Sequence, residues 1–294
     1  MILQDPAGGF TARVLTRDPR SNKAKALARL GAEIVPADLD DETSVRRAFE
    51  GAYGAFCVTF FWTHLSPEKE IAQATTMARA AKDSGVAHVI WSTLEDSRAW
   101  VPLGDSRMPT LRGRYKVPHF DGKAEANQAF SQLGVPTTFL LTSFYWDNFI
   151  HFGIGPHRRA DGTLALTLPL GDAKLPGIAA EDIGRCAYGL FKKDGEFLGK
   201  TVGIAGEHLT GAQMALALSR ALGCGVQYNS VSPETYRRLD VPNAEEQGNM
   251  FQFKRDFPEV FCGARDVELS RRLNPSLYTF ARWLAENRTR MSIP

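Results

Sequence analysis

The stretch Thr11-Ala12-Arg13-Val14-Leu15-Thr16-Arg17-Asp18-Pro19 indicates a short strand that ends in a charged turn. Its centre is apolar and favours strand structure, and Pro19 stops the strand from continuing. Residues 20–30 then have the composition and apolar spacing of a helix. A strand tip with Arg17 and Arg20 ahead of a helix is a suitable place to hold a phosphate.

Size and composition restrict the class of protein. The chain has 294 residues, of which 44% are hydrophobic and 23% are charged, so it can bury a sizeable core as one large domain or a large and a small one. A net charge of +2, with no Lys/Arg run longer than a pair, argues against direct binding of nucleic acid. No signal peptide and no apolar run near the roughly 20 residues of a membrane span are found. We therefore predict no membrane partner and a cytoplasmic location, with nuclear access left open.

The four cysteines, Cys57, Cys186, Cys224 and Cys262, are far apart and have no histidine at metal-ligand spacing. This pattern predicts no metal site and favours buried free thiols in a reducing compartment.

Strands and helices alternate through the first half of the chain. Strands are predicted over residues 32–38, 54–59, 86–91 and 137–141, with helical segments between them. This order predicts an α/β protein with a doubly wound parallel sheet, in which residues 54–59 are covered on both faces. Ligands bind at the carboxyl ends of such strands. The predicted site is therefore built from the strand tips, which carry Arg17, Asp38, Thr59 with the aromatic residues from Phe60 beyond it, Ser92-Thr93 and Thr142-Ser143.

The regular pattern lapses twice. Residues 96–118 predict an irregular loop of the kind that covers a site or is mobile. In the second half, residues 162–168 and 201–205 predict strands, residues 180–193 a helix, and residues 210–213 have the spacing of a capping box. We interpret this half as a smaller, helical lobe.

Two pairs of side chains are candidates for chemistry, each with a plainer alternative. His119 and Lys123, four residues apart, share one helix face and could bind a ribose and transfer a proton, but a solvated helix surface has the same spacing. Arg17 and Arg20 could select a 2′-phosphate or belong to a solvated turn.

Two further candidates follow strands. The Ser92 hydroxyl could bind a substrate carbonyl, although hydroxyls also end strands for turn reasons. Residues 144–148, which include Tyr145 and Asn148, could enclose a planar ring or pack between lobes.

Several short segments taken together resemble the NmrA-like family of atypical short-chain dehydrogenases, and the likeness extends almost to the C-terminus. They are residues 13–19 (RVLTRDP), 31–35 (GAEIV), 38–41 (DLDD), 51–53 (GAY), 119–123 (HFDGK), 134–136 (GVP) and 271–275 (RRLNP).

This resemblance implies a Rossmann-like, NADP(H)-binding domain over residues 1–150, with its sheet completed by about 178–205, and a smaller lobe of residues 151–177 and 206–294. It implies that Arg17 reads the 2′-phosphate, that Thr59 and Phe60 lie beside the cofactor, that Lys123 binds the ribose, and that residues 145–148 lie near the nicotinamide. Several members are redox-sensing regulators, so a protein partner is also implied.

The first departure from the family pattern concerns the proton donor. Active relatives have a Tyr-x-x-x-Lys pair, whereas this chain has His119 four residues before Lys123. A phenol has a reference pKa of about 10 and an imidazole one of about 6.5, so the available chemistry differs. This departure favours little or no reductase turnover.

The second departure concerns the first strand and the glycine-rich turn that binds pyrophosphate. Gly8-Gly9 lacks the required glycine spacing and follows no strand. The missing strand is expected between the strands that end near Arg17 and Thr59, where its loss leaves backbone groups unpaired at about 1–3 kcal/mol for each buried one. Either a segment ahead of Met1 supplies the strand or the sheet closes in another way.

Three functions remain open. The first is a regulator whose NADP(H) state changes the shape offered to a protein partner. The second is an NADP-dependent reductase of a small carbonyl or conjugated substrate, with His119, Lys123 or Ser92 in the reaction. The third is a scaffold that binds no dinucleotide.

Overall fold

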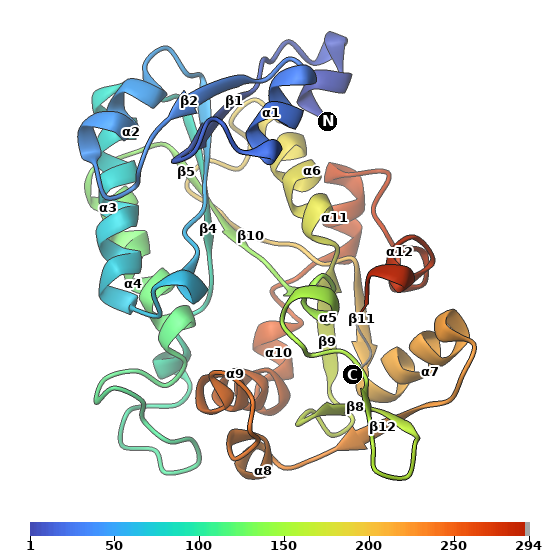
Figure 1. Ribbon diagram of the computed structural model, residues 1–294. Coiled ribbons are helices and arrows are strands. Elements are labelled where there is room, and N and C mark those ends of the chain that lie inside the picture. The colour runs from blue at the N-terminus through green and yellow to red at the C-terminus, as the bar shows by residue number, and fades with distance from the viewer. Residues whose placement is uncertain (292–294) are drawn as a thin grey trace. The chain divides into compact units, whose positions relative to one another are not determined.

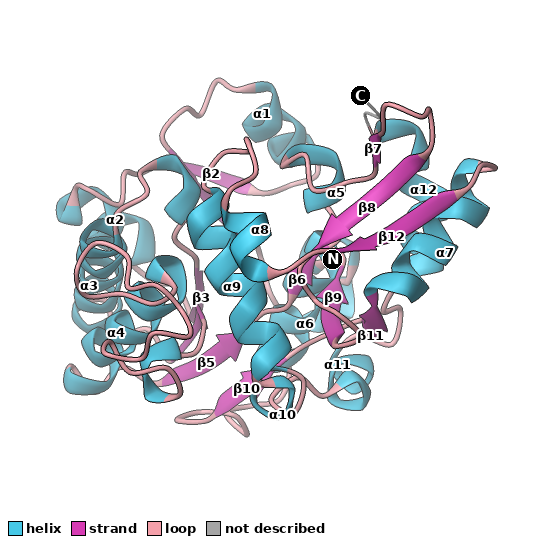
Figure 2. Cartoon of the chain, turned by 90° about the horizontal axis from the view of Figure 1, so that it is seen from below, coloured by secondary structure: helices cyan, strands magenta, loops and turns pink. Residues whose placement is uncertain are grey.

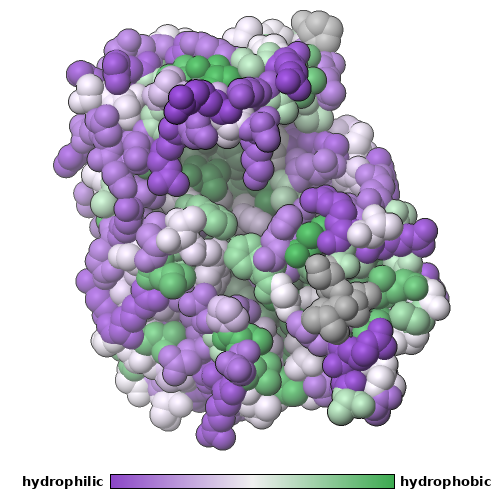
Figure 3. Space-filling model, in the orientation of Figure 1, coloured by the Kyte–Doolittle hydropathy of each residue, from purple (hydrophilic) through white to green (hydrophobic). Residues whose placement is uncertain are grey.

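The computed structural model describes residues 1–291 and divides into two compact units (Figure 1). The first unit consists of Met1–Asp96, His119–Leu140 and Ala187–Thr201. The second consists of Ser97–Pro118, Leu141–Cys186 and the chain from Val202 onward. No helix within residues 1–291 is long and apolar enough to cross a membrane. Hydrophilic side chains cover most of the surface seen in Figure 3, and hydrophobic ones gather in smaller groups.

The strands of the first unit form two separate sheets. One pairs β1 (Arg13–Thr16) with β2 (Glu33–Pro36) in parallel. The other has the order β10-β5-β4-β3, and β3 runs parallel to β4 with Gly54 opposite His88. Its strands are β3 (Gly54–Cys57), β4 (His88–Thr93), β5 (Thr137–Leu141) and β10 (Thr201–Gly203), and of β10 only Thr201 belongs to the first unit.

The helices of this region lie between the predicted strands. They are α1 (Asn22–Arg29), α2 (Glu42–Phe49), α3 (Pro67–Asp83) and α4 (Pro118–Gln132). Ser66 caps α3, because its hydroxyl accepts the Lys69 backbone N–H at 3.2 Å and Pro67 occupies the first turn. The predicted alternation of strands and helices, and with it the α/β class, is confirmed.

One hydrophobic core joins both sheets of the first unit. It contains apolar faces of α2, α3 and α4, residues of β3 and β4 such as Cys57 and Trp91, and, packed against it, Leu15 of β1 and Val35 of β2. Both sheets therefore pack against the same core and belong to one layer. The N-terminal ends of β1 and β3 are also tied together, because the Arg13 guanidinium donates to the Glu50 carbonyl at 2.8 Å.

A strand is missing from the middle of this layer, as the sequence predicts. Within residues 1–291, β1 pairs only with β2 and β3 pairs only with β4, which leaves two open edges. Phe56 of β3 is 38% exposed and Val58 is 44% exposed. The prediction that residues 54–59 are covered on both faces is therefore wrong, because this strand stands at an edge and only its Cys57 face packs against the helices.

The first ten residues lie at the amino end of these strands. Two 3-10 turns, Ile2–Gln4 and Pro6–Gly8, are followed by Phe10, whose ring lies 5.5 Å from that of Tyr53. The Asp5 carboxylate accepts a hydrogen bond from the Tyr188 hydroxyl at 2.8 Å. Gly8 thus packs against Tyr188, and Gly9 follows it at a φ of +71°.

The second unit contains two three-stranded sheets (Figure 2), so the expectation of a helical lobe was incomplete. One has the order β11-β9-β6 and the other β12-β8-β7. In chain order these strands are β6 (Phe144–Tyr145), β7 (His157–Arg158), β8 (Leu164–Leu168), β9 (Lys174–Ile178), β11 (Glu207–Thr210) and β12 (Val226–Ser230). Sequence patterns missed β9 because Pro176 and Gly177 interrupt it.

The helices from α5 onward include both predicted and unpredicted ones. They are α5 (Asn148–His151), α6 (Ala180–Phe191), α7 (Gly211–Leu222), α8 (Pro233–Arg237), α9 (Ala244–Asp256), α10 (Pro258–Phe261), α11 (Val267–Leu273) and α12 (Phe280–Asn287). The predicted capping box is present, since the Thr210 hydroxyl accepts the Gln213 N–H and the Gln213 side chain accepts the Thr210 N–H.

Of the predicted irregular loop, residues 96–118, all but Asp96 belongs to the second unit. The Lys116 ammonium donates to the carbonyls of Asp105 at 2.8 Å and Met108 at 2.6 Å. The Asn249 amide of α9 donates to the carbonyls of Pro109 at 2.9 Å and Lys116 at 2.6 Å. Buried polar side chains therefore satisfy the backbone groups that this loop cannot pair by itself.

Candidate functional site

A buried lysine forms the centre of the candidate site in the first unit. The Lys123 ammonium donates to the Thr59 hydroxyl at 2.6 Å and to the Thr59 carbonyl at 3.3 Å, and it lies 2.9 Å from Glu70 Oε2. The Thr59 hydroxyl in turn donates to the same Glu70 oxygen at 2.5 Å. Lys123 is 8% exposed and Glu70 is 0% exposed. A loop residue after β3 and two helices thus meet in one buried polar cluster.

Close packing of α4 on α3 makes this cluster possible. A Cβ atom at Gly122 would lie 2.9 Å from the Cβ of Pro67, so only glycine allows the two helices to approach this closely. The backbone of α4 is held from the other side by β4, because the Thr93 hydroxyl donates to the Lys123 carbonyl at 3.2 Å. Lys123 is therefore positioned at the carboxyl ends of β3 and β4, where a parallel sheet binds ligands.

The sequence analysis missed Glu70. Its position in the sequence could have indicated a buried ion pair. Glu70 lies four residues before Ala74, on the apolar face of α3, and burial of an acid there without a partner costs free energy. Its second oxygen, Oε1, is buried without a hydrogen-bond partner. A charged residue on the apolar face of a predicted helix indicates a buried partner of opposite charge.

The sequence analysis also missed His64, which faces the other side of Glu70. The His64 Nδ1 atom accepts the Ser66 backbone N–H at 3.1 Å, so the neutral ring carries its proton on Nε2. That Nε2 atom lies 3.4 Å from Glu70 Oε1, and both atoms are buried without a hydrogen-bond partner. Glu70 is thus placed between a cation that it already binds and an imidazole that is close enough to become a second partner.

His119 lies on the same side of α4 as Lys123 but is enclosed by rings. Its side chain is 6% exposed, and its ring centroid lies 4.9 Å from that of Trp62 and 5.7 Å from that of Phe61. The alternative of a solvated helix surface for His119 and Lys123 is therefore wrong. Spacing alone could not show this, because the aromatic residues that cover the pair come from the loop after β3.

The electrostatics of Lys123 follow from its burial. Removal from water lowers the pKa of the Lys123 ammonium below its usual value, and the Glu70 carboxylate opposes this decrease. The ammonium also lies 5.1 Å from the centroid of the Trp91 ring, whose indole N–H donates to Asn127 at 2.9 Å. Glu70 thus favours the charged form of Lys123.

The other predicted residues of the first unit lie at strand ends. Arg17 follows β1 directly and Arg20 lies in the next turn, both exposed. Asp38, half-buried after β2, accepts the Asp40 N–H at 3.0 Å through its carboxylate. Ser92 is buried near the end of β4, and Phe60 is 54% exposed. Because β1 and β3 begin at the same end of the layer, their tips at Arg17 and Thr59 lie at its opposite edge.

Tyr145 and Asn148 belong to the second unit. The Tyr145 hydroxyl donates to the Thr142 hydroxyl at 3.3 Å, and Asn148 is the first residue of α5. Their predicted contact with a nicotinamide stays a prediction.

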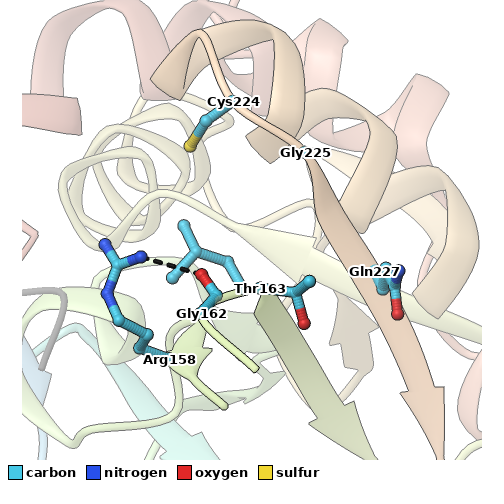
Figure 4. Close-up of a pocket in the computed structure, with 7 residues that line it drawn as sticks. Arg158, Gly162, Thr163, Cys224, Gly225 and Gln227 are labelled. Carbon is cyan, nitrogen blue, oxygen red and sulfur yellow. Dashed lines mark hydrogen bonds between the residues drawn. The ribbon is translucent and has the colours of Figure 1, made fainter. Parts of the chain in front are cut away.

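The second unit also has a pocket of about 350 Å³, lined by residues of β7, β8 and β12 and the turns beside them (Figure 4). Arg158 and Cys224 lie at its wall, and the Arg158 guanidinium donates to the Gly162 carbonyl at 2.9 Å. Because Arg158, the cation that lines this pocket, is already bound to a backbone carbonyl, the pocket offers few groups that could recognise a ligand.

The cysteines are free, and only two of them are fully buried. Cys57 and Cys186 are buried, whereas Cys224 is exposed and Cys262 is intermediate, so the expectation of four buried thiols was wrong for the latter two. Among residues 1–291 no group of three His, Cys, Asp or Glu side chains is arranged to hold a metal ion.

The parallel strands, the helices that cover them and the polar residues at the strand ends place this chain in the class of Rossmann-like α/β proteins. The model of the NmrA-like family matches residues 2–276. The chain therefore belongs to the NmrA-like family, as the resemblance in its sequence indicated.

Curated relatives include both oxidoreductases and a regulator. The chain is 28% identical over 253 residues to the NmrA-like family domain-containing oxidoreductase malD of Malbranchea aurantiaca, which covers 81% of this chain and 72% of the relative. It is 28% identical over 246 residues to the nitrogen metabolite repression protein nmr of Neurospora crassa, which covers 79% of this chain and 46% of that protein.

Two kinds of solved structure share the fold. NmrA, a negative transcriptional regulator crystallised with NADP, aligns with a TM-score of 0.76 at 23% identity over 97% of this chain and 90% of its own. The triphenylmethane reductase of Citrobacter sp. in complex with NADP(H) aligns with a TM-score of 0.73 at 18% identity over 97% of this chain and 94% of its own.

Proposed function

We propose that this protein binds NADP(H) through its first unit and acts as a redox-sensing regulator with little or no dehydrogenase turnover. The observation that carries the proposal is the buried cluster of Thr59, Glu70 and Lys123. In this cluster the Lys123 ammonium lies at the carboxyl ends of β3 and β4, the edge at which a Rossmann-like sheet binds ligands, and all three of its N–H groups are already engaged.

The residues present fit the adenosine and ribose parts of a dinucleotide. Arg17 and Arg20 are exposed at the tip of β1, where their guanidinium groups suit a 2′-phosphate. Asp38 follows the neighbouring strand, and Lys123 with Thr59 would hold the ribose beside the nicotinamide. When bound, the dinucleotide supplies or accepts a hydride.

The pyrophosphate is the part that fits less well. Within residues 1–291 no strand and glycine-rich turn lie between β1 and β3, and Gly8 and Gly9 are packed in a turn at the amino end of the layer. Backbone N–H groups at a helix start, the usual cradle of a pyrophosphate, are thus missing from the described residues at this place. This observation supports the scaffold function as the alternative to binding.

The proton donor needed for turnover is also poorly provided. His119 replaces the tyrosine of active relatives, and its ring is enclosed by Phe61 and Trp62. A general acid must reach the proton acceptor within about 3 Å, directly or through one water. Binding without turnover is therefore the function that the first unit supports best.

The relatives support a regulatory role and keep a second candidate open. A negative transcriptional regulator and a nitrogen metabolite repression protein are among them, which favours a protein partner and a cytoplasmic location with access to the nucleus. Other relatives are named as oxidoreductases, which favours NADP-dependent reduction of a small carbonyl or conjugated substrate.

Calorimetric titration of NADPH and NADH into the 294-residue protein tests binding. We expect NADPH to bind more tightly than NADH, and Arg17→Ala to remove most of this preference, while Arg29→Ala, an exposed arginine on α1, leaves it unchanged. A chimaera that carries the strand and glycine-rich turn of an NADP-bound relative at its N-terminus serves as the reference. If only the chimaera binds, the scaffold function is correct.

Turnover is tested separately. NADPH absorbance is followed with a panel of carbonyl and conjugated substrates. Substrate-dependent oxidation that is lost in Lys123→Ala would contradict the regulatory proposal and support the reductase.

A further inference from the structure

The three hydrogen-bond donors of Lys123 are all used inside the protein. An ammonium has three N–H groups, and these point to the Thr59 carbonyl, the Thr59 hydroxyl and Glu70 Oε2. Lys123 can therefore bind ribose hydroxyls only by giving up one of these partners. Glu70 and Thr59 thus decide when the lysine becomes available.

Release of the Lys123 ammonium from the Glu70 carboxylate would ordinarily cost free energy. Glu70 is 0% exposed, and a buried carboxylate that loses its counter-ion keeps its desolvation penalty. In this cluster, however, the His64 Nε2 atom lies 3.4 Å from the unpartnered Oε1 of Glu70, and the Ser66 N–H fixes the ring so that this nitrogen bears the proton. A small movement of the imidazole would supply the missing hydrogen bond.

We propose that Glu70 is a positioning residue of the dinucleotide site: it holds the Lys123 ammonium beside Thr59 and releases it to the ribose hydroxyls while His64 becomes the partner of Glu70. The inference rests on the proposed function, because it requires the dinucleotide at Lys123. It assigns roles to Glu70 and His64 in addition to that function.

The Thr59 hydroxyl can remain bound to Lys123 when the lysine leaves Glu70. It accepts from Lys123 at 2.6 Å while it donates to Glu70 at 2.5 Å, so the lysine keeps one partner when it leaves the carboxylate. The titratable groups that face Glu70 are Lys123 from α4 and His64 from the loop before α3. The neighbouring Lys69 of α3 is paired with Asp40 at 2.7 Å instead.

The first experiment uses the protein without NADPH. The Lys123 ¹³Cε resonance, assigned by its absence in Lys123→Met, is titrated in wild type and in Glu70→Gln. Without the carboxylate, burial of the cation is uncompensated, so the midpoint should fall by about one pH unit or more. Glu68→Gln, an exposed acid on the same turn, is the matched control and should leave the midpoint unchanged. An unchanged midpoint in Glu70→Gln overturns the proposal.

The second experiment is a double-mutant cycle on NADPH affinity. Glu70→Gln should weaken binding about tenfold in the wild-type background, because the ammonium is no longer held in position beside Thr59 before the dinucleotide arrives, and less than about twofold in the Lys123→Met background. Equal losses in both backgrounds would show a merely structural role and overturn the proposal. If wild type itself binds no NADPH, the proposed function fails, which is a separate result.

Two further variants complete the test. His64→Phe removes the second partner of Glu70, so it should weaken NADPH binding while the Lys123 midpoint stays near that of wild type. Unchanged affinity in this variant refutes the role of His64. Should Glu70→Gln fail to fold, Glu70→Asp keeps the charge but shortens its reach, and it should lower NADPH affinity with a midpoint closer to that of wild type.

Discussion

Replacement of Lys123 by methionine tests how the buried cluster contributes to stability. The substitution keeps the length of the side chain, but it removes the cation that lies over the Trp91 ring and leaves the Glu70 carboxylate without its partner. Removal of one member of a buried ion pair costs about 3–5 kcal/mol. We expect the lower end, about 3 kcal/mol, because the Thr59 hydroxyl still donates to Glu70 and His64 is 3.4 Å away.

Urea unfolding followed by circular dichroism measures this loss. For a domain of ordinary stability, about 5–15 kcal/mol, a decrease of about 3 kcal/mol is large and should be seen as a lower midpoint at unchanged slope. The double variant Lys123→Met/Glu70→Gln should recover at least about half of the loss, because the penalty belongs to the charge that remains. Lys69→Met, which breaks a half-exposed pair with Asp40, should cost at most about 1 kcal/mol.

The result that would refute this reasoning is specific. If Lys123→Met is as stable as wild type, Glu70 is not held by its cation. If the double variant is less stable than the single one, the loss comes from packing and not from the unpaired charge.

Three other predictions concern the edge strand, the thiols and pH. Phe56→Ala should cost less than about 2 kcal/mol, because its ring is 38% exposed, whereas Phe130→Ala, fully buried and stacked on Trp91, should cost about 3–5 kcal/mol; urea unfolding compares them. A thiol reagent under native conditions should label Cys224 before Cys57, because Cys57 is buried and burial raises the pKa of its thiol to about 12; peptide mapping identifies the order. Burial lowers the folded-state pKa of Lys123 below the unfolded value near 10.4, so the unfolded chain binds more protons between these two values. Between these two pH values, the slope of the free energy of unfolding against pH should therefore be more positive for wild type than for Lys123→Met. Equal slopes in the two proteins would contradict this prediction.

The unpaired edges of β1 and β3 could accept an additional strand. Both open edges, at β1 and β3, present backbone groups that another strand could pair with, and an exposed apolar edge is a recognised risk for association. The chimaera described above supplies such a strand. It should unfold at a higher urea concentration than the 294-residue protein, and Phe56 should then become protected from solvent.

Asn274 explains one family segment in structural terms. Its amide donates to the buried Asp182 carboxylate at 2.7 Å, and the same carboxylate accepts the Tyr278 backbone N–H at 2.8 Å. The segment 271–275 thus fixes the chain after α11 to α6 within the second unit. A short motif that helps to identify a family can therefore report packing and not ligand binding.

The sequence by itself determined the alternation of strands and helices, their caps and the strand tips. These features depend on secondary-structure propensity, on the periodicity of apolar residues and on the residues that cap helices and end strands. All of these can be read from residues that are neighbours in the sequence. Thr59 and Lys123 were found in this way because each belongs to a local pattern. That no strand pairs between β1 and β3 within residues 1–291 also followed, because residues 1–10 have no strand pattern.

Only the tertiary structure decided which side chains meet. Glu70 and His64 lie more than fifty residues before Lys123, and no local rule pairs an acid on α3 with a base on α4. Likewise, the aromatic rings that enclose His119 come from the loop after β3. Contacts of this kind depend on how helices pack, here on the close approach that Gly122 allows, and packing is a property of the whole fold. The strand from Thr11 to Pro19 could be predicted from its own residues, but the buried cluster around Lys123 could not.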